Sequence, residues 1–168
     1  MAIKRYIAEA DNTITNAFEA NLITRATKAN MGAADVLETF VIHGQTSASI
    51  SAESAEEARI IIQFPISGTD TAIETIHRDR NDNKIPAQGK VSFYLRMFNA
   101  PHAESTPEDF DLDVKIISKS WSEGRGLDMD TYSDTGFSSW LSSSSGSAWS
   151  SPGGYKLFSK HFLLLRFL

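Results

Sequence analysis

The stretch ARIIIQFPI, Ala58–Ile66, is a dense run of β-branched and aromatic residues, and it decides the fold class. Such a run is typical of a strand with a buried face. The sequence predicts a strand here with Ile60, Ile62 and Phe64 facing the interior. Pro65 limits ladder hydrogen bonding beyond it.

Three further stretches support a fold made of strands. VSFYLRMF (91–98) and FDLDVKII (110–117) alternate apolar and polar residues with period two, and DVLETFVIHG (35–44) is β-branched and aromatic until Gly44. Each of them predicts a strand with one face toward a core. The side chains expected in that core are Ile60, Ile62, Phe64, Phe93, Leu95, Leu112, Val114 and Ile116.

Only SAESAEEAR (51–59) indicates a helix, with Ser51 or Ser54 as its cap. Residues 77–89 and 99–110 are rich in turn formers and predict connections between strands. The sequence therefore predicts an all-β protein, an antiparallel jelly-roll-like β-sandwich with long loops and at most short helical turns. We expect residues 1–156 to form a single domain and residues 157–168 an apolar tail that docks on the core or on a neighbour.

Composition limits the classes of function. The chain has 168 residues, a net charge of −5 and no cysteine, so disulfides and thiolate metal sites are excluded. The acidic balance argues against a nucleic-acid partner, because that affinity depends on Lys and Arg at phosphates. The tail's uncharged run, HFLLL, is too short to cross a membrane. No apolar run of signal-peptide length is found at the start, so we expect an extracellular form to leave by lysis or inside a particle.

Motifs for catalysis are missing from the sequence. The four histidines stand at no metal-ligand spacing, and neither a nucleophile elbow nor a phosphate-binding loop is found. We therefore expect a non-enzymatic protein with no catalytic residues and no cofactor. A weak calcium candidate is the set Asp128, Asp130 and Asp134, although a solvated loop is the favoured interpretation of these acids.

Three tryptophans raise the main question about function. Trp121 and Trp140 enclose the loop WSEGRGLDMDTYSDTGFSSW, and Trp149 follows soon after it. Exposed together, the three rings would form a platform for stacking sugars; buried, they would anchor a long loop to the fold. Burial is favoured, because a loop with little regular structure needs anchors to become ordered.

The order of several short motifs resembles the DNRLRE-type β-sandwich domain. The matching segments are Asp11–Thr15, Asn30–Gly32, Arg59–Phe64, Ile85–Gly89, Val91–Phe98 and Val114–Glu123. The longer form, with WSEGRGLDMD and AWSSPGG, resembles virion structural proteins of tailed bacteriophages, especially marine ones. The similarity covers most of residues 10–154 and implies a jelly-roll-like sandwich that binds or assembles, with no catalytic residues to carry over.

The chain departs from this pattern after Gly154. The family would continue with an acidic residue and another alternating strand, whereas this chain continues with YKLFSKHFLLLRFL. Two explanations stay open: a shifted reading frame, or a variant whose end docks on a neighbour. If the tail docks, deleting residues 157–168 should weaken assembly more than it destabilises the isolated fold.

These features predict a bacteriophage virion structural protein, a capsid decoration, fibre or tail-associated subunit that assembles by surface contacts. Its expected location is the virion, and its expected partners are other virion proteins and copies of itself. The alternative is a carbohydrate-binding module that recognises a host glycan. The position in the particle and the oligomeric state stay open. The residues expected at interfaces are Trp121, Trp140, Trp149, Phe158, Phe162, Leu164 and Phe167.

Overall fold

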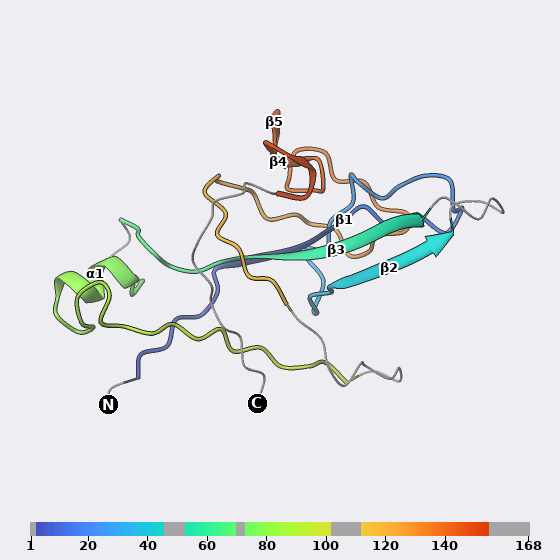
Figure 1. The fold of residues 1–168 in the computed structure, drawn as a ribbon. Helices are drawn as coiled ribbons and strands as arrows, with labels where there is room; N and C mark the ends of the chain where they lie inside the picture. Colours follow the sequence, from blue (N-terminus) through green and yellow to red (C-terminus); the bar gives the residue numbers. More distant parts are fainter. Residues whose placement is uncertain (1–2, 46–52, 70–72, 102–111, 155–168) are drawn as a thin grey trace. The chain divides into compact units, whose positions relative to one another are not determined.

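A computed structural model describes residues 3–45, 53–69, 73–101 and 112–154 (Figure 1). Its regular structure is mostly strand with almost no helix, so the all-β class is confirmed. The chain divides into two compact units. One, here the sheet unit, comprises Arg5–Pro65 and Ile117–Lys156; the other, here the α1 unit, comprises Met1–Lys4, Ile66–Ile116 and Leu157–Leu168. The jelly-roll sandwich and the single domain over residues 1–156 stay predictions.

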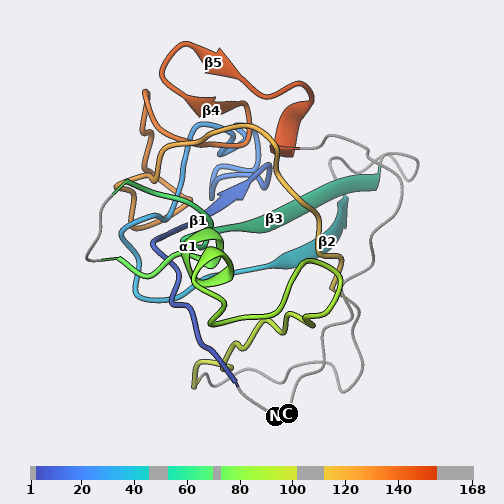
Figure 2. The same ribbon diagram turned by 90° about the vertical axis from the view of Figure 1, so that its left-hand side faces the viewer.

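The sheet unit contains a three-stranded antiparallel sheet in the order β1-β3-β2. These strands are β1 (Ala10–Thr15), β2 (Phe40–Gln45) and β3 (Glu53–Gln63). Figures 1 and 2 show β3 running between its two neighbours. Ala58 is the point where all three strands are in register, because it stands opposite both Thr15 of β1 and Phe40 of β2.

The strand predicted from the ARIIIQFPI stretch is confirmed as far as Gln63, and Phe64 lies beyond its end and is half-buried. The helix predicted over residues 51–59 is wrong. Strand β3 begins at Glu53 and includes most of that segment. Its alanines and glutamates favour a helix only weakly, by tenths of a kcal/mol per residue. Pairing with a neighbour on each side supplies a ladder of backbone hydrogen bonds, and this tertiary context outweighs the local propensity.

The core of the sheet unit lies on a face of β3 that differs from the predicted one. Ile61 is buried in a cluster with Ile14, Trp140 and Trp149, whereas Ile60 and Ile62 are only half-buried. A run of consecutive isoleucines has no period-two pattern, so it cannot specify which face of a central strand turns inward.

The strands predicted over residues 91–98 and 110–117 are not formed in the described part of these segments. Residues 91–98 and 112–117 carry no strand pairing, and Phe93 and Ile116 are 46% and 82% exposed. Both residues were predicted in the core, and this placement is wrong. Alternation creates a buried face only when a strand is paired and its face is covered, and these segments have no ladder.

A small hairpin completes the regular structure of the sheet unit. Strands β4 (Ser142–Ser144) and β5 (Ser147–Ala148) pair antiparallel, and the short 3-10 helix η1 (Pro152–Gly154) follows. Ser143 is buried, and its hydroxyl donates to the carbonyl of Ser147 at 3.2 Å. This serine-rich segment is therefore an ordered structural element.

The described residues of the α1 unit form one helix, α1 (Ile76–Asn81), where only a turn-rich connection is predicted from residue 77 on. Thr75 caps it: its hydroxyl accepts a hydrogen bond from the backbone N–H of Arg78 at 3.2 Å. The helix ends at Asn81 with Asp82 as its C-cap, and Asn83 follows with a left-handed φ of 58°. The sequence does not predict this helix, because its cap, Thr75, lies outside the segment predicted as a connection, residues 77–89.

Within α1, the carboxylate of Asp79 is fully buried and pairs with two lysines. The ammonium nitrogens of Lys4 and Lys84 lie 3.2 and 3.3 Å from its oxygens. These three residues are here called the Asp79 cluster. Lys4 also bonds to Glu74, and this bond, together with Asp79, raises the pKa of the Lys4 ammonium above its usual value.

Candidate functional site

The loop from Trp121 to Trp140 is held at both ends by the sheet unit. Trp140 is buried in the core cluster, and Trp121 is half-buried against it. The backbone N–H of Ser122 donates to Ser143 of β4 at 2.9 Å, and the N–H of Ser138 donates back to Ser122 at 2.9 Å. The prediction that tryptophans anchor this loop within its own chain is confirmed for Trp140, and also for Trp149, which is buried in the same cluster.

Asn12 of β1 connects the end of this loop to the sheet. Its side-chain nitrogen donates to the hydroxyl of Ser138 at 2.7 Å and to the Ser138 carbonyl at 3.2 Å. Its side-chain oxygen accepts from the backbone N–H of Met31 at 2.9 Å. One buried amide thus satisfies groups from two other segments, which fixes both segments against β1.

Asn30 bonds to the middle of the Trp121–Trp140 loop. Its side-chain oxygen accepts from the N–H of Gly126 at 2.9 Å, and its nitrogen donates to the carboxylate of Asp134 at 3.2 Å. The same carboxylate oxygen accepts from the N–H of Arg125 at 2.9 Å. Together with the contacts of Asn12, these bonds form one buried polar group, here called the amide cluster: Asn12, Asn30, Asp134 and Ser138.

Glycine is required where the loop meets the Asn30–Gly32 turn. A Cβ added at Gly126 would overlap the backbone oxygen of Asn30, and one at Gly124 would overlap its side chain. The N–H of Ala33 donates to the carbonyl of Gly126 at 3.0 Å across this approach. The GRG motif therefore lets two backbones come into direct contact.

The three acids considered as calcium ligands have separate structural partners. Asp134 belongs to the amide cluster, and Asp130 accepts from the N–H of Ala20 at 2.7 Å. Asp128 accepts from the N–H groups of Asp130 and Thr131, and the bond from Thr131 in particular lowers the pKa of its carboxyl. Among the described residues no group of three or more acidic or imidazole side chains is placed to hold a metal ion.

Asp11 and Glu123 bring two carboxylates together at the start of the loop. The backbone N–H of Asp11 donates to Glu123 at 2.8 Å, which seats the glutamate beside β1. Partial burial, and secondarily the charge of Glu123, raise the pKa of the Asp11 carboxyl. The two carboxylates are 112 positions apart in the chain, so the sequence alone does not pair them.

Arg59 fastens the segment that follows β5. Its guanidinium donates to the carbonyl of Gly153 at 2.7 Å and lies over the Trp140 ring, 4.5 Å from the centroid. Gly153 has a left-handed φ of 79°, and its N–H donates to the carbonyl of Trp140 at 2.6 Å. A side chain at this position would collide with both Arg59 and Trp140. The SPGG motif therefore closes the core cluster.

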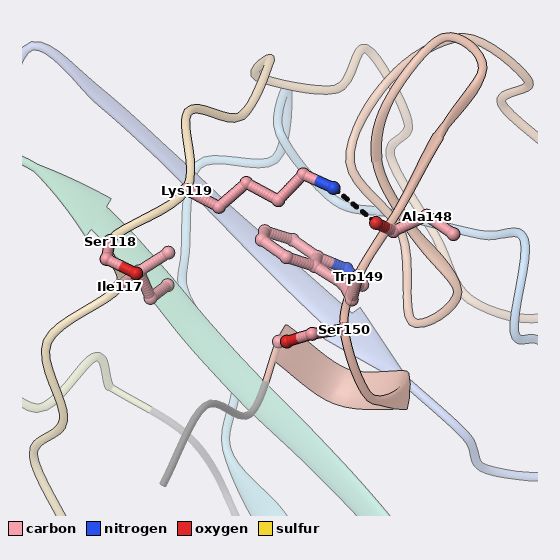
Figure 3. Close-up of a pocket in the computed structure, with 7 residues that line it drawn as sticks. Ile117, Ser118, Lys119, Ala148, Trp149 and Ser150 are labelled. Carbon is pink, nitrogen blue, oxygen red and sulfur yellow. Dashed lines mark hydrogen bonds between the residues drawn. The ribbon is translucent and has the colours of Figure 1, made fainter. Parts of the chain in front are cut away.

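A pocket of about 360 Å³ lies beside this cluster (Figure 3). Lys119 spans it and donates from its ammonium to the carbonyl of Ala148. Trp149 contributes the aromatic wall, but its ring is buried and its Nε1–H donates to the carbonyl of Ser139 at 2.7 Å. The pocket therefore has one cation and little exposed aromatic surface. Its lining residues are Ile117, Ser118, Lys119, Ala148, Trp149, Ser150 and Gly154.

The remaining predicted interface residues cannot be placed. Phe158, Phe162, Leu164 and Phe167 lie outside the described residues. The residues that sequence analysis missed are Asn12 and Asn30. The available signal was the pair of small-residue motifs at Asn30–Gly32 and Gly124–Gly126, whose glycines indicate a close backbone approach.

None of the helices in the described part of the chain has the length and apolar character needed to span a bilayer. Comparison with protein-family models, with curated proteins and with solved structures finds no match for this chain.

Proposed function

We propose that this chain is a non-enzymatic structural subunit of a bacteriophage particle, which assembles through surface contacts. The observation that carries the proposal is the amide cluster. Its buried polar side chains bond to the backbone of the Trp121–Trp140 loop and fix its shape. A long loop held rigid by its own chain offers a neighbouring subunit a surface of constant shape, which reduces the entropy lost on association.

The resemblance to virion proteins supports the same proposal. The motifs that carry it, the Asn30–Gly32 turn and the WSEGRGLD segment, contact each other directly in the structure. Their appearance together in the sequence thus has a physical basis, because each motif is needed for the other to pack. We further propose that the β1-β3-β2 sheet is one layer of a jelly-roll-like sandwich.

The experiment that tests this function is a census of purified particles. Phage particles are separated from soluble protein on a density gradient, and the chain is quantified by mass spectrometry against the major capsid protein. A fixed copy number in intact particles is the expected result. If the chain is found only in the soluble fraction of the lysate, the proposal fails.

A carbohydrate-binding module is the second candidate, favoured by the pocket beside Trp149. Lys119 and Ser150 could bond to sugar hydroxyls there, although the buried Trp149 ring leaves little surface for stacking. A glycan array with the wild type and a Lys119→Ala variant tests this candidate. A glycan bound by the wild type and lost in the variant would favour it over a purely structural role.

A further inference from the structure

The outer edges of the three-stranded sheet, formed by β1 and β2, differ in the hydrogen bonds that they make to other segments. On the β1 edge, the N–H of Asp11 donates to Glu123 at 2.8 Å and the carbonyl of Thr13 accepts from Met31 at 3.1 Å. On the other side, β2 is the last strand of the sheet, and within the described residues it borders no further strand. The β1 edge is therefore closed by loops, whereas no strand of the described residues pairs with the outer edge of β2.

The register shows which backbone groups face the open side. Glu57 of β3 accepts a hydrogen bond from the N–H of Asn16, so its backbone groups point toward β1. Backbone groups alternate in direction along a strand, so Ala58 points toward β2, where it stands opposite Phe40. The next residue of β2, Val41, therefore turns its N–H and C=O away from β3.

The side chains of β2 are also suited to contact. Val41 and Ile42 are 64% and 47% exposed, and as adjacent residues they lie on opposite faces of the strand. The strand, FVIHGQ, has no proline, lysine, arginine or acid. Natural proteins use charges, prolines and bulges to keep an exposed edge from pairing with another strand. The β2 edge has none of these protections.

Two acidic side chains opposite β2, those of Glu57 and Glu56, have partners within the chain. Glu57, opposite Val41 in the ladder, forms an ion pair with Arg59 at 2.5 Å. Glu56, opposite Ile42, accepts from the backbone N–H of Phe18 at 2.9 Å. Opposite Val41 and Ile42, an uncharged strand whose neighbouring acids are engaged elsewhere can meet an identical strand without bringing like charges face to face.

We infer that β2 pairs antiparallel with β2 of a second copy of this chain, about a two-fold axis. The two sheets then become one continuous sheet, and the apolar side chains on both faces of β2 pack against their equivalents. Such an isologous contact uses the same patch twice, so it needs a surface that is complementary to itself. This inference deepens the proposed function by naming one contact between subunits, and it rests on that function only for its place in a particle.

Oligomeric state tests the inference. The full chain is compared by analytical ultracentrifugation with Val41→Lys/Ile42→Lys, and we expect the double variant to raise the dimer dissociation constant by at least about tenfold. The matched control is the double variant Leu22→Lys/Ile23→Lys, which places the same two charges at a turn where these side chains are 75% and 84% exposed. The control should dimerise like the wild type.

A proline variant separates pairing from folding. Because the Val41 N–H points to the open side, Val41→Pro blocks strand addition and leaves the ladder to β3 intact. We expect a monomer with an unfolding midpoint close to that of the wild type. A wild type that is monomeric at all concentrations, or a Val41→Pro chain that dimerises normally, overturns the inference.

Cysteine cross-linking reports the geometry directly, since the chain has no native cysteine. Single substitutions Val41→Cys, Ile42→Cys, His43→Cys and Gly44→Cys are oxidised in turn. Two-fold pairing predicts one maximum of disulfide dimer near the axis, with lower yields on both sides. Uniformly absent cross-links would contradict the pairing. Dimerisation in a chain missing from particles would refute only the proposed function.

Discussion

Buried polar side chains hold two regions of this molecule, but the two regions use different chemistry. The amide cluster fixes the Trp121–Trp140 loop, and the bonds that Asp134 accepts from Asn30 and Arg125 come from neutral N–H groups. The Asp79 cluster instead places a buried carboxylate between two ammonium groups. The bonds to Asp134 come from neutral donors to a buried carboxylate and are screened little by salt, whereas ion pairs with an exposed partner are screened. The loop should therefore keep its shape over a wider range of conditions than the α1 segment.

The largest effect should come from Gly126→Ala. The added methyl group overlaps the backbone oxygen of Asn30, which cannot move without breaking the turn. We expect a loss of more than about 3 kcal/mol in the free energy of unfolding, measured by urea denaturation. The control is Gly68→Ala, where the nearest atom lies 3.8 Å away, an ordinary contact distance. If both variants unfold at the same urea concentration, the close approach is not real.

Asn30→Ala should be next in size. It removes the partner of the Gly126 N–H and one donor to Asp134 while these groups stay buried. Leaving them unpaired costs about 2–4 kcal/mol in the free energy of unfolding. Asn21→Ala, at an exposed turn, should cost less than about 1 kcal/mol under the same conditions. Equal losses for the two asparagines would refute the special role of the amide cluster.

Asp79→Asn sharpens the contrast between a buried carboxylate with neutral donors, Asp134, and one with ammonium donors, Asp79. The change keeps the size of the side chain and removes the charge that pairs with Lys4 and Lys84. Lys84 is about half exposed, so its ammonium can return to water and the expected loss is modest, about 1–2 kcal/mol. Trypsin cleavage at Arg78 and Arg80, mapped by mass spectrometry, should accelerate, while cleavage at Arg125 stays unchanged. Accelerated cleavage at all three sites would mean that the two regions do not respond separately.

The pKa of Lys4 gives this contrast a pH dependence. The folded-state pKa is raised, so the contribution of Lys4 to stability is complete below the unfolded value near 10.4. It is lost as the pH rises through the folded value. The amide cluster has no lysine, and its contribution should not change over that window.

Part of the fold and of the loop's anchoring could be predicted from the sequence. Contacts between residues far apart in the chain could not. The strand at β3 and the burial of Trp140 follow from local composition. The pairing of Asn30 with Gly126 does not, because the two residues are 96 positions apart and each motif alone is an ordinary turn signal. The helix predicted over 51–59 failed for the same reason, since the partners of β3 come from other parts of the chain.

The smallest effect concerns Asp11→Asn. Folding raises the pKa of the Asp11 carboxyl, so the ionised carboxyl destabilises the folded state. This destabilisation is absent below the unfolded pKa near 3.9 and grows as the pH rises through the folded pKa. The substitution should therefore increase stability at pH 7 by well under about 1 kcal/mol, because Asp11 is largely accessible to screening. At pH 3 the two proteins should unfold alike. A gain of the same size at pH 3 would assign the effect to another cause than charge.

The separation between Asn12 and Ser138 also has a consequence for synthesis on the ribosome. The two residues are 126 positions apart, so β1 leaves the ribosome long before the segment that covers it exists. Contacts of such long range form late in folding. During this interval the side-chain amides of Asn12 and Asn30 bond to water. An exposed amide gives other nascent chains less surface for aggregation than an exposed apolar face does. Because the contacts that cover β1 are polar, β1 can stay exposed until the segment with Ser138 is synthesised, at a low risk of aggregation.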